Sequence, residues 1–282
     1  MKIRNLDEFK AIDADSKLQE WEDVLSNAVF KSQDKRVLFP GHCQNCDQDV
    51  DFIVDDNYAV DVAGKKYVNY RERLVCPQCQ LNNRMRALIG LLGEYVDIKN
   101  DKIYLYEQVT PMFKAITEKS GGENIVGSEY LGEQYESGYI SPEGVRHEDA
   151  MKLSFADASF KAILSNDVFE HVMDIKKTIK EAYRVLEEKG VLLTTVPFYF
   201  NQQKTQKRAE IKNGQLVHLQ KPIYHGDPMN VEKGCLVIYD YGWDLLDLMR
   251  DTGFSDVYFQ NIYSPANGNI GVRCIMVLVA IK

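Results

Sequence analysis

The sequence predicts an α/β fold in which a mostly parallel sheet has helices on both sides, with a small cysteine-bearing β module in front. Three observations support this prediction. Strand and helix patterns alternate from about residue 100 onward, as expected for parallel strands joined by helical crossovers. The run Val191–Val196 is apolar except for two threonines and carries no charge, which is typical of a strand buried on both faces. Two Cys-x-x-Cys pairs, at 43–46 and 76–79, stand among short alternating segments typical of hairpins.

Length and composition limit the possible classes of protein. A chain of 282 residues suits one large domain plus a small module, and 45% apolar with 27% charged residues is ordinary for a full core. The net charge of −8 argues against general nucleic-acid binding, so no nucleic-acid partner is expected. No run approaches the roughly 18 apolar residues of a membrane span. The first residues lack the apolar segment of a secretory signal, so a cytoplasmic location is expected.

The chain is expected to divide into three parts. Residues 1–35 are polar, with apolar residues at helical spacing, which predicts an amphipathic helix and leaves room for a short helix before it; those residues are Leu18, Trp21, Val24, Leu25 and Val29. Residues 36–81 are expected to form a zinc-ribbon-like module of small hairpins. Residues 82–282 are expected to form the large domain, with an insertion on its substrate side at 199–242.

Individual elements of the large domain follow from caps and apolar runs. A helix is expected to begin at Asn82 or Asn83, since either side chain can cap it. Strands are predicted at 102–106, 124–128, 162–165, 191–196, 256–260 and 272–281, and further helices at 110–119, 175–186 and 240–253. A short loop between the last two strands indicates a terminal antiparallel hairpin.

The two cysteine pairs predict a zinc site. An x₂ spacing lets two thiolates on one tight turn face one ion, so Cys43, Cys46, Cys76 and Cys79 can complete a tetrahedron. With all four positions filled by protein, the zinc would be structural. One alternative is four buried or free cysteines that merely happen to be paired in the sequence. Another is a redox Cys-x-x-Cys, which the presence of two such pairs and the lack of a thioredoxin-like context disfavour. His42 could replace one ligand, and Cys235 and Cys274 are expected in the core.

Residues 147–198 carry an ordered series of motifs. These are Asp149-Ala150, Leu153-Ser-Phe155, the predicted strand 162–165, Glu170-His171-Val172, Arg184-Val-Leu186 with Lys189-Gly190, and Val191–Pro197. The series closely resembles that of the class I S-adenosylmethionine (SAM)-dependent methyltransferases, and in particular the methyltransferase type 11 family. The cysteine pairs followed by Arg84-x-Arg86 resemble a zinc-ribbon branch of them. The resemblance implies a Rossmann-like, mostly parallel seven-stranded sheet with a terminal antiparallel hairpin, and SAM as cofactor.

In such a sheet, ligands bind outside the carboxyl ends of the strands. The resemblance therefore implies that Glu129, beside Tyr130, accepts the ribose hydroxyls, and that Asp149, beside Ala150, accepts the adenine amino group. Around the methionine moiety it places Asn166, Asp167, Val168 and His171. Other interpretations stay open: Glu129 as a solvated loop acid, Asp149 as a turn cap, His171 as a backbone-orienting residue and Glu170 as the cap of the next helix.

The loop after the first predicted strand departs from the family. It reads Glu107-Gln-Val-Thr-Pro111 and lacks the glycines that let a backbone approach a ligand. Thr110 is expected to cap a helix with Pro111 at its first position, and that N-terminus could face the methionine carboxylate. Glu107 can replace the family's acidic residue, so Glu107, Gln108, Thr110 and Pro111 remain candidates for binding SAM.

The insertion at 199–242 combines aromatic and polar residues, which suits a sugar or another polyhydroxylated acceptor. His225, in the turn His225-Gly-Asp-Pro228, can act as a general base on a hydroxyl, with His171 as a second catalytic candidate. His218 is a weaker candidate, and a loop histidine without catalytic role is the alternative. Basic residues could meet a phosphate or could simply be solvated: Lys204, Lys207, Arg208 and Lys212.

The leading hypothesis is therefore a SAM-dependent methyltransferase (EC 2.1.1.-) that methylates an oxygen of a sugar, a glycan or another small hydroxylated acceptor. The alternative is a methyltransferase-like binding module without catalysis, whose ribbon holds a partner; the missing glycine loop favours it. An RNA or protein methyltransferase guided by the ribbon is a third hypothesis, and the acidic balance speaks against RNA. The acceptor and the oligomeric state do not follow from the sequence.

Overall fold

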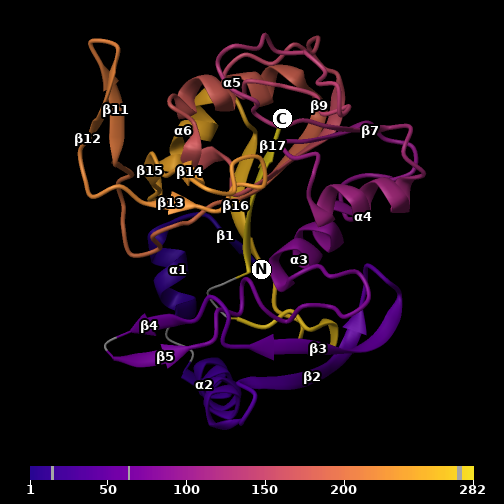
Figure 1. Cartoon of the computed structure of the whole chain (residues 1–282), viewed down its shortest axis with the longest axis vertical. Coiled ribbons are helices and arrows are strands. Elements are labelled where there is room, and N and C mark those ends of the chain that lie inside the picture. Colours follow the sequence, from indigo (N-terminus) through magenta and orange to yellow (C-terminus); the bar gives the residue numbers. More distant parts are fainter. Residues whose placement is uncertain (14–15, 63, 272–274) are drawn as a thin grey trace. The chain divides into compact units, whose positions relative to one another are not determined.

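The computed structural model describes residues 1–13, 16–62, 64–271 and 275–282, which cluster into two compact units (Figure 1). The smaller unit comprises Met1–Ile3, Asp7–Glu94 and Phe259–Val277. The larger unit comprises Arg4–Leu6, Tyr95–Tyr258 and Leu278–Lys282. The three-part division expected at residues 35 and 81, with the insertion at 199–242, stays a prediction.

Two hairpins and three helices make up most of the smaller unit. They are α1 Leu6–Asp13, α2 Ser16–Lys31, β2 Arg36–Cys43, β3 Gln48–Asp55, β4 Val60–Val62, β5 Lys65–Tyr67 and α3 Asn83–Leu92. The expected helices and small hairpins are thus present. On α2, Val29 is buried and Leu25 packs against the core, whereas Val24 is exposed. The side chains of Leu18 and Trp21 lie outside the described part of the chain.

The core of the smaller unit surrounds the cysteine turns. Its buried members are Val29, Cys43, Phe52, Val54, Val68, Tyr70, Leu74, Cys76 and Ile270. Asn82 caps α3 as predicted, because its side chain accepts from the backbone N–H of Met85 at 2.9 Å. Buried Asn83 donates to the carbonyls of Tyr70 and Ile270, which ties the start of α3 to segments far away in the sequence.

The seven-stranded sheet has the order β1-β16-β17-β9-β8-β6-β7. Its strands are β1 Lys2–Ile3, β6 Ile103–Leu105, β7 Ile125–Gly127, β8 Phe160–Asn166, β9 Leu186–Thr195, β16 Asp256–Asn261 and β17 Met276–Ile281. Strands β7, β6, β8 and β9 run parallel, and β17 pairs antiparallel with β9. The predicted Rossmann-like, mostly parallel sheet with antiparallel strands at its C-terminal end is confirmed.

The helices of the larger unit are α4 Pro111–Ser120, α5 Ile175–Val185 and α6 Asp244–Thr252. The helix predicted from residue 240 begins later, because Tyr239–Asp240 forms β15, which pairs with β10 at Gln206–Lys207. Of the strand predicted at 272–281, residues 272–274, Cys274 included, lie outside the described residues. The connection before it is longer than the short loop expected and contains the 3₁₀ turn η2, Pro265–Asn267.

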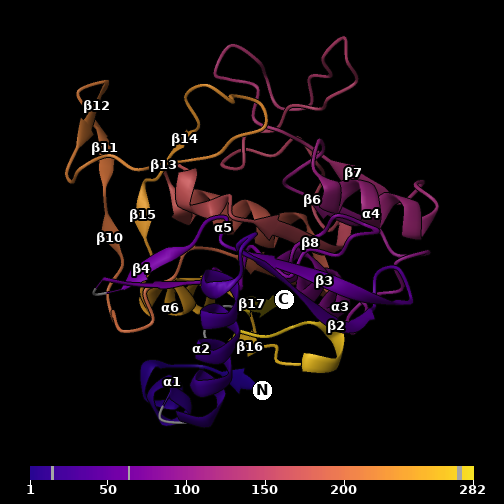
Figure 2. The same ribbon diagram turned by 60° about the horizontal axis from the view of Figure 1, so that its bottom comes forward.

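The insertion forms short antiparallel pairs: β11 Ala209–Lys212 with β12 Gln215–His218, and β13 Tyr224–His225 with β14 Cys235–Leu236. The β11–β12 hairpin stands away from the rest of the larger unit in both views (Figures 1 and 2). At its base, buried Arg208 donates to Asp240 and Gln220. Arg208 is therefore committed to a buried ion pair and does not join the neighbouring lysines in a phosphate site.

Among the helices in the described part of the chain, none combines the length and apolar character needed to cross a bilayer.

Candidate functional site

The loop after β6 is organised by a carboxylate on the neighbouring strand end. Glu129, just beyond β7, is half-buried, and its Oε1 accepts from the backbone N–H groups of Gln108 at 2.6 Å and Val109 at 2.9 Å. A carboxylate that accepts two amides fixes the loop by charge-assisted hydrogen bonds. Glu129 is thus a structural part of the strand edge, and the solvated loop acid considered from the sequence is not what the structure contains.

The loop itself has no glycine, but a glycine on the neighbouring strand β7 makes room for its backbone. A Cβ added at Gly127 of β7 would lie 2.6 Å from the carbonyl oxygen of Glu107 and 2.5 Å from the ring of Phe113. Only glycine allows the loop backbone to pass that close to β7. This role of Gly127 was not predicted, and its signal in the sequence is a glycine near the end of the strand predicted at 124–128.

The start of α4 follows the sequence prediction. Thr110 Oγ1 accepts from the N–H of Phe113 at 3.2 Å, and Pro111 occupies the first helical turn. Glu107 is buried at the end of β6, 5% exposed. The loop 107–110 therefore leads from the sheet edge into a capped helix N-terminus, which is a favourable place for an anionic group.

The pKa of Glu129 is raised from its ordinary value. Burial is the main cause, the two amides act in the opposite direction, and the charge of Asp227 adds to the increase. Asp227 belongs to the insertion, two residues after His225. The insertion therefore places a second negative charge near Glu129 at the carboxyl edge of the sheet.

A third segment lies parallel to the end of β7. Glu129 and His147 form a parallel bridge, and Gln108 Oε1 accepts from the N–H of Arg146 at 2.8 Å. His147 is buried, and its Nδ1 accepts from the N–H of Leu131 at 2.9 Å. The residues around 107–109, 129–131 and 146–149 thus form one hydrogen-bonded surface.

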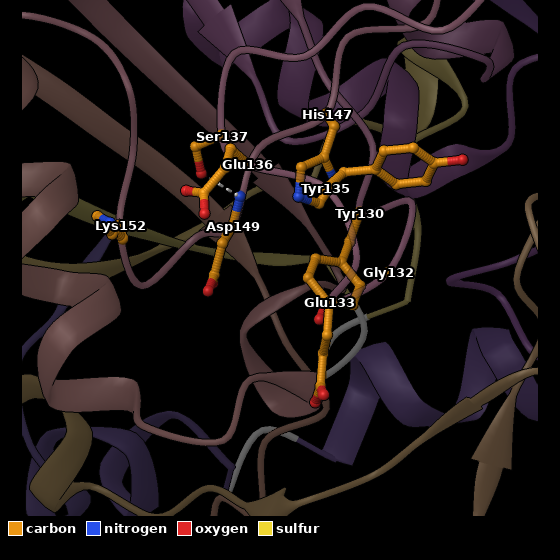
Figure 3. A pocket seen from close by; sticks show the side chains of 9 residues that line it. All are labelled: Tyr130, Gly132, Glu133, Tyr135, Glu136, Ser137, His147, Asp149 and Lys152. Carbon is orange, nitrogen blue, oxygen red and sulfur yellow. Dashed lines mark hydrogen bonds between the residues drawn. The ribbon is translucent and has the colours of Figure 1, made fainter.

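A cavity of about 200 Å³ opens on this surface (Figure 3). Tyr130, Gly132, Glu133, Tyr135, Glu136, Ser137, His147, Asp149 and Lys152 line it. The backbone N–H of Asp149 donates to Ser137 Oγ. The side-chain Oδ1 of Asp149 accepts from the N–H of Met151 at 2.8 Å. The turn-cap interpretation of Asp149 is therefore correct for one oxygen, while its side chain also faces the cavity. Tyr130 is 53% exposed beside it.

The end of β8 presents two more polar side chains. Thr195 of β9 donates from Oγ1 toward Asn166 Oδ1 and Asp167 Oδ1, each at 3.1 Å. Asp167 has a φ of +57°, a left-handed conformation that turns the chain out of the strand. Ala150 and Val168 lie half-buried in the turns next to Asp149 and Asp167. The predicted cofactor-binding residues thus gather at the carboxyl ends of β6, β7 and β8.

A compact group of titratable side chains follows directly after β8. Glu170 and His171 lie in the 3₁₀ turn η1, Phe169–His171, and His225 comes from β13 of the insertion. Glu170 Oε1 lies 3.6 Å from His171 Nε2 and 3.4 Å from His225 Nδ1. The two imidazole rings are perpendicular, with centroids 5.1 Å apart. The structure thus brings together both histidines that the sequence singled out as catalytic candidates.

Several hydrogen bonds hold the insertion against η1. His171 Nδ1 lies 2.8 Å from the carbonyl oxygen of Leu236, the N–H of Ile238 donates to the carbonyl of Glu170, and Tyr241 donates to that of Phe169.

The prediction that Glu170 caps α5 is wrong, because Asp174 does so through the N–H groups of Lys176 and Lys177. His218, by contrast, is exposed on β12.

The four paired cysteines of the smaller unit converge. Cys43 Sγ lies 3.9 Å from Cys79 Sγ, Cys46 Sγ lies 3.8 Å from Cys76 Sγ, and all four sulfurs lie within 4.8 Å of one another. Four sulfurs about 2.3 Å from a tetrahedral zinc would be about 3.8 Å apart, so the geometry fits this ion. Cys235, in contrast, is half-buried on β14 opposite His225.

The cysteine thiols cannot all ionise by themselves. The hydrogen bond from Cys79 lowers the pKa of Cys43 to about 4, whereas burial raises that of Cys46 to about 11. The contact with Cys43 in turn raises the pKa of Cys79 far above its usual range. Buried Arg86 lies near these sulfurs, over the ring of Phe52, and can offset part of the negative charge of a four-thiolate site.

Part of the larger unit is similar in sequence to a known family. Residues 111–194 match the family model described as "Methyltransferase domain", which confirms the resemblance over these residues, although the match covers less than half of the chain. No curated protein matches the chain. Residues 111–194 are therefore similar to a methyltransferase domain, and they lie within the Rossmann-like sheet described above.

Similar solved structures include an S-adenosylmethionine-dependent methyltransferase from Mesorhizobium loti, with 15% identity over 69% of this chain and 96% of that one, at a TM-score of 0.43. A "putative S-adenosylmethionine dependent methyltransferase" from Listeria monocytogenes has 13% identity over 70% of this chain and 98% of that one, at a TM-score of 0.43. A 1,6-didemethyltoxoflavin-N1-methyltransferase from Burkholderia thailandensis has 14% identity over 71% and 78%, at 0.39.

Proposed function

We propose that this protein transfers a methyl group from SAM to an oxygen of a small hydroxylated acceptor, with a sugar or glycan as the expected class. The observation that carries the proposal is the strand edge itself. There the loop 107–110, Glu129 and the cavity beside Asp149 adjoin one another through hydrogen bonds. This is the edge at which open α/β sheets bind their ligands.

Each group at the edge has a chemical task in this proposal. Glu129 accepts the ribose hydroxyls, and Asp149 with Tyr130 borders the adenine in the cavity. Asn166, Asp167 and Val168, with the N-terminus of α4, surround the methionine moiety. SAM supplies an electrophilic methyl group, so the protein mainly has to align the acceptor oxygen with the sulfonium carbon.

Activation of the acceptor falls to Glu170, His171 and His225. A hydroxyl has a high pKa and attacks poorly unless its proton is removed or its oxygen is polarised. Two imidazoles beside a buried carboxylate are the groups best suited to this task near the sheet edge. The aromatic insertion supports a polyhydroxylated acceptor, because Tyr199 and Tyr224 are exposed on it.

The cysteine cluster has a structural role in this proposal. Zinc bound by Cys43, Cys46, Cys76 and Cys79 would have no open position for a substrate, so the ion stabilises the smaller unit and takes no part in the transfer. The sulfur spacings support zinc, and elemental analysis of the purified protein is the direct test.

Calorimetric titration with SAM tests the function. Wild type is expected to bind SAM with micromolar affinity. Glu129→Gln is expected to bind about tenfold more weakly, because an amide loses a charge-assisted acceptor for the ribose, worth about 1.5 kcal/mol. Glu123→Gln, exposed and just before β7, is the matched control and should bind like wild type.

Transfer itself is then followed with methyl-labelled SAM and a panel of free sugars, sugar phosphates and amines. Label in a hydroxylated product supports the proposal, and label only in amines contradicts the oxygen acceptor. Complete absence of SAM binding would overturn the enzyme hypothesis and leave the non-catalytic binding module in its place.

A further inference from the structure

We propose that Glu170, His171 and His225 bind a divalent metal ion at the acceptor side of the methyltransferase domain. The three residues offer one carboxylate oxygen and two imidazole nitrogens, and these ligand atoms all lie within 4.8 Å of one another. Two imidazoles with one carboxylate form a ligand set that suits zinc and related first-row metals.

The spacing of the ligand atoms matches coordination better than hydrogen bonding. Glu170 Oε1 lies 3.4 Å from His225 Nδ1 and 3.6 Å from His171 Nε2. Two ligands about 2.0 Å from a tetrahedral zinc are about 3.3 Å apart, close to both distances. The same relation holds for the sulfur pairs of the cysteine cluster, at 3.8 and 3.9 Å.

The carboxylate of Glu170 calls for a cation. Its residue is 0% exposed, and neither Oε1 nor Oε2 has a hydrogen-bond partner among the described residues. A buried carboxylate without hydrogen-bond partners carries a large desolvation cost unless a positive charge offsets it. A divalent ion between Glu170 and the two rings supplies that charge.

The hydrogen bond on the far side of His171 fixes the ring for metal binding. The carbonyl oxygen of Leu236 can only accept, so Nδ1 of His171 carries the proton and donates to it. In the neutral ring Nε2 then has a lone pair, and that lone pair faces the carboxylate of Glu170. Metal-binding histidines commonly donate their other nitrogen to a carbonyl in this way.

Three protein ligands leave one position of a tetrahedral ion open. The catalytic part of this inference rests on the proposed function, whereas the binding of the ion does not. The acceptor hydroxyl occupies the open position, which lowers its pKa, and its proton leaves to solvent. The oxygen then forms a bond to the methyl carbon as the carbon–sulfur bond breaks, and the bonding electrons stay with S-adenosylhomocysteine.

The inference gives His225 a role different from the one expected from the sequence. As a metal ligand, His225 Nδ1 cannot take the proton of the acceptor, and the ion performs that task in its place. A general base and a metal ligand differ in a measurable way, because only the ligand changes the metal content of the protein.

Counting zinc in the full-length, tag-free protein tests the proposal. Wild type is loaded with excess Zn²⁺, freed of unbound ion by gel filtration and analysed for metal per chain. Glu170→Gln and His171→Ala are treated identically and are expected to hold one zinc fewer than wild type. His218→Ala removes an exposed imidazole and should hold as much zinc as wild type.

A second measurement guards against variants that fail to fold. Zn²⁺ should raise the Tm of chelator-treated wild type by more than that of Glu170→Gln, a near-isosteric change, because both proteins regain the zinc of the cysteine cluster and only wild type regains the second ion, while both proteins bind SAM equally. Equal zinc content in wild type and Glu170→Gln overturns the metal site. Loss of SAM binding in wild type overturns the proposed function instead, so the two failures are distinguishable.

Discussion

The cysteine cluster and the Glu170–His171–His225 group each bring candidate metal-ligand atoms within 4.8 Å of one another, but they are built differently. The cluster takes its ligands from two tight turns of Cys-x-x-Cys spacing, within the core of the smaller unit. The group takes two ligands from the turn after β8 and the third from an insertion strand far along the chain. The first is written locally in the sequence, and the second exists only after folding.

The two sites also differ in how charge is compensated. Arg86 lies near the four cysteine sulfurs, which offer all four positions of a tetrahedral ion. Within the described residues, the carboxylate of Glu170 has no hydrogen-bond partner, and its ligand set has three members. A closed, compensated site favours stability, whereas an open and uncompensated one favours reactivity.

The largest effect is expected from breaking the closed site. Cys76→Ser removes one of four thiolates, and most of the ~10 kcal/mol of zinc-binding free energy that such sites contribute to folding is then at stake. Circular dichroism and limited proteolysis should show an unfolded smaller unit and no zinc in it. The control is Cys235→Ser, on β14 of the larger unit, which should leave the smaller unit folded and its zinc bound. Equal stability of the two variants would contradict the structural role of the cysteine cluster.

The open site should respond in opposite directions with and without metal. In metal-free protein at alkaline pH, where imidazoles carry no charge, Glu170→Gln removes an uncompensated buried carboxylate and should raise the free energy of unfolding by about 3 kcal/mol. With Zn²⁺ present, the same change should lower it, because the ion is lost. Thermal unfolding of wild type and Glu170→Gln is measured without metal and with Zn²⁺. A change of the same sign under both conditions would contradict a metal site at Glu170.

A smaller effect is expected at Gly127, where the path of loop 107–110 depends on the absence of a side chain. Gly127→Ala places a Cβ 2.6 Å from the carbonyl oxygen of Glu107, so the loop has to shift at a cost of about 2 kcal/mol. Denaturant unfolding should register that cost, and SAM affinity should fall with it. Gly93→Ala, whose added Cβ meets its nearest atom at 3.6 Å, is the control and should change neither.

The smallest effect concerns pH. Because burial raises the pKa of Glu129, its neutral form is favoured in the folded protein. The free energy of unfolding should therefore decrease as pH rises through the raised pKa, and Glu129→Gln should lack this decrease. SAM affinity should change in the opposite direction, weakening as pH falls through that pKa. A pH series of unfolding curves and titrations checks both, and Asp227→Asn should shift the transitions to lower pH.

Much of the fold could be predicted because it depends on local patterns. The mostly apolar run at 191–196 lies almost wholly in the buried strand β9, Thr110 and Asn82 are helix caps, and the Cys-x-x-Cys spacings mark convergent sulfurs. In each case the physical cause lies within a few residues of the signal.

The rest could not be predicted because its causes lie far apart in the chain. Nothing near Glu170 indicates that His225 will face it, so a helix cap was the reasonable expectation. Gly127 serves a loop twenty residues earlier on the neighbouring strand, which only the pairing of β6 with β7 reveals. Likewise, the sequence places Arg208 in a basic cluster, and only the folded structure shows that it pairs with Asp240, 32 residues later.

The contact of His171 and Glu170 with the insertion has a kinetic consequence. Joining His171 to His225 closes a long loop of chain, and that closure costs entropy that the few backbone bonds of β13 and β14 have to offset. An ion bound by both His171 and His225 would crosslink the two ends of this loop. The supply of metal would then set how long the insertion stays fastened over the strand edge, and so how quickly an acceptor enters and a methylated product departs.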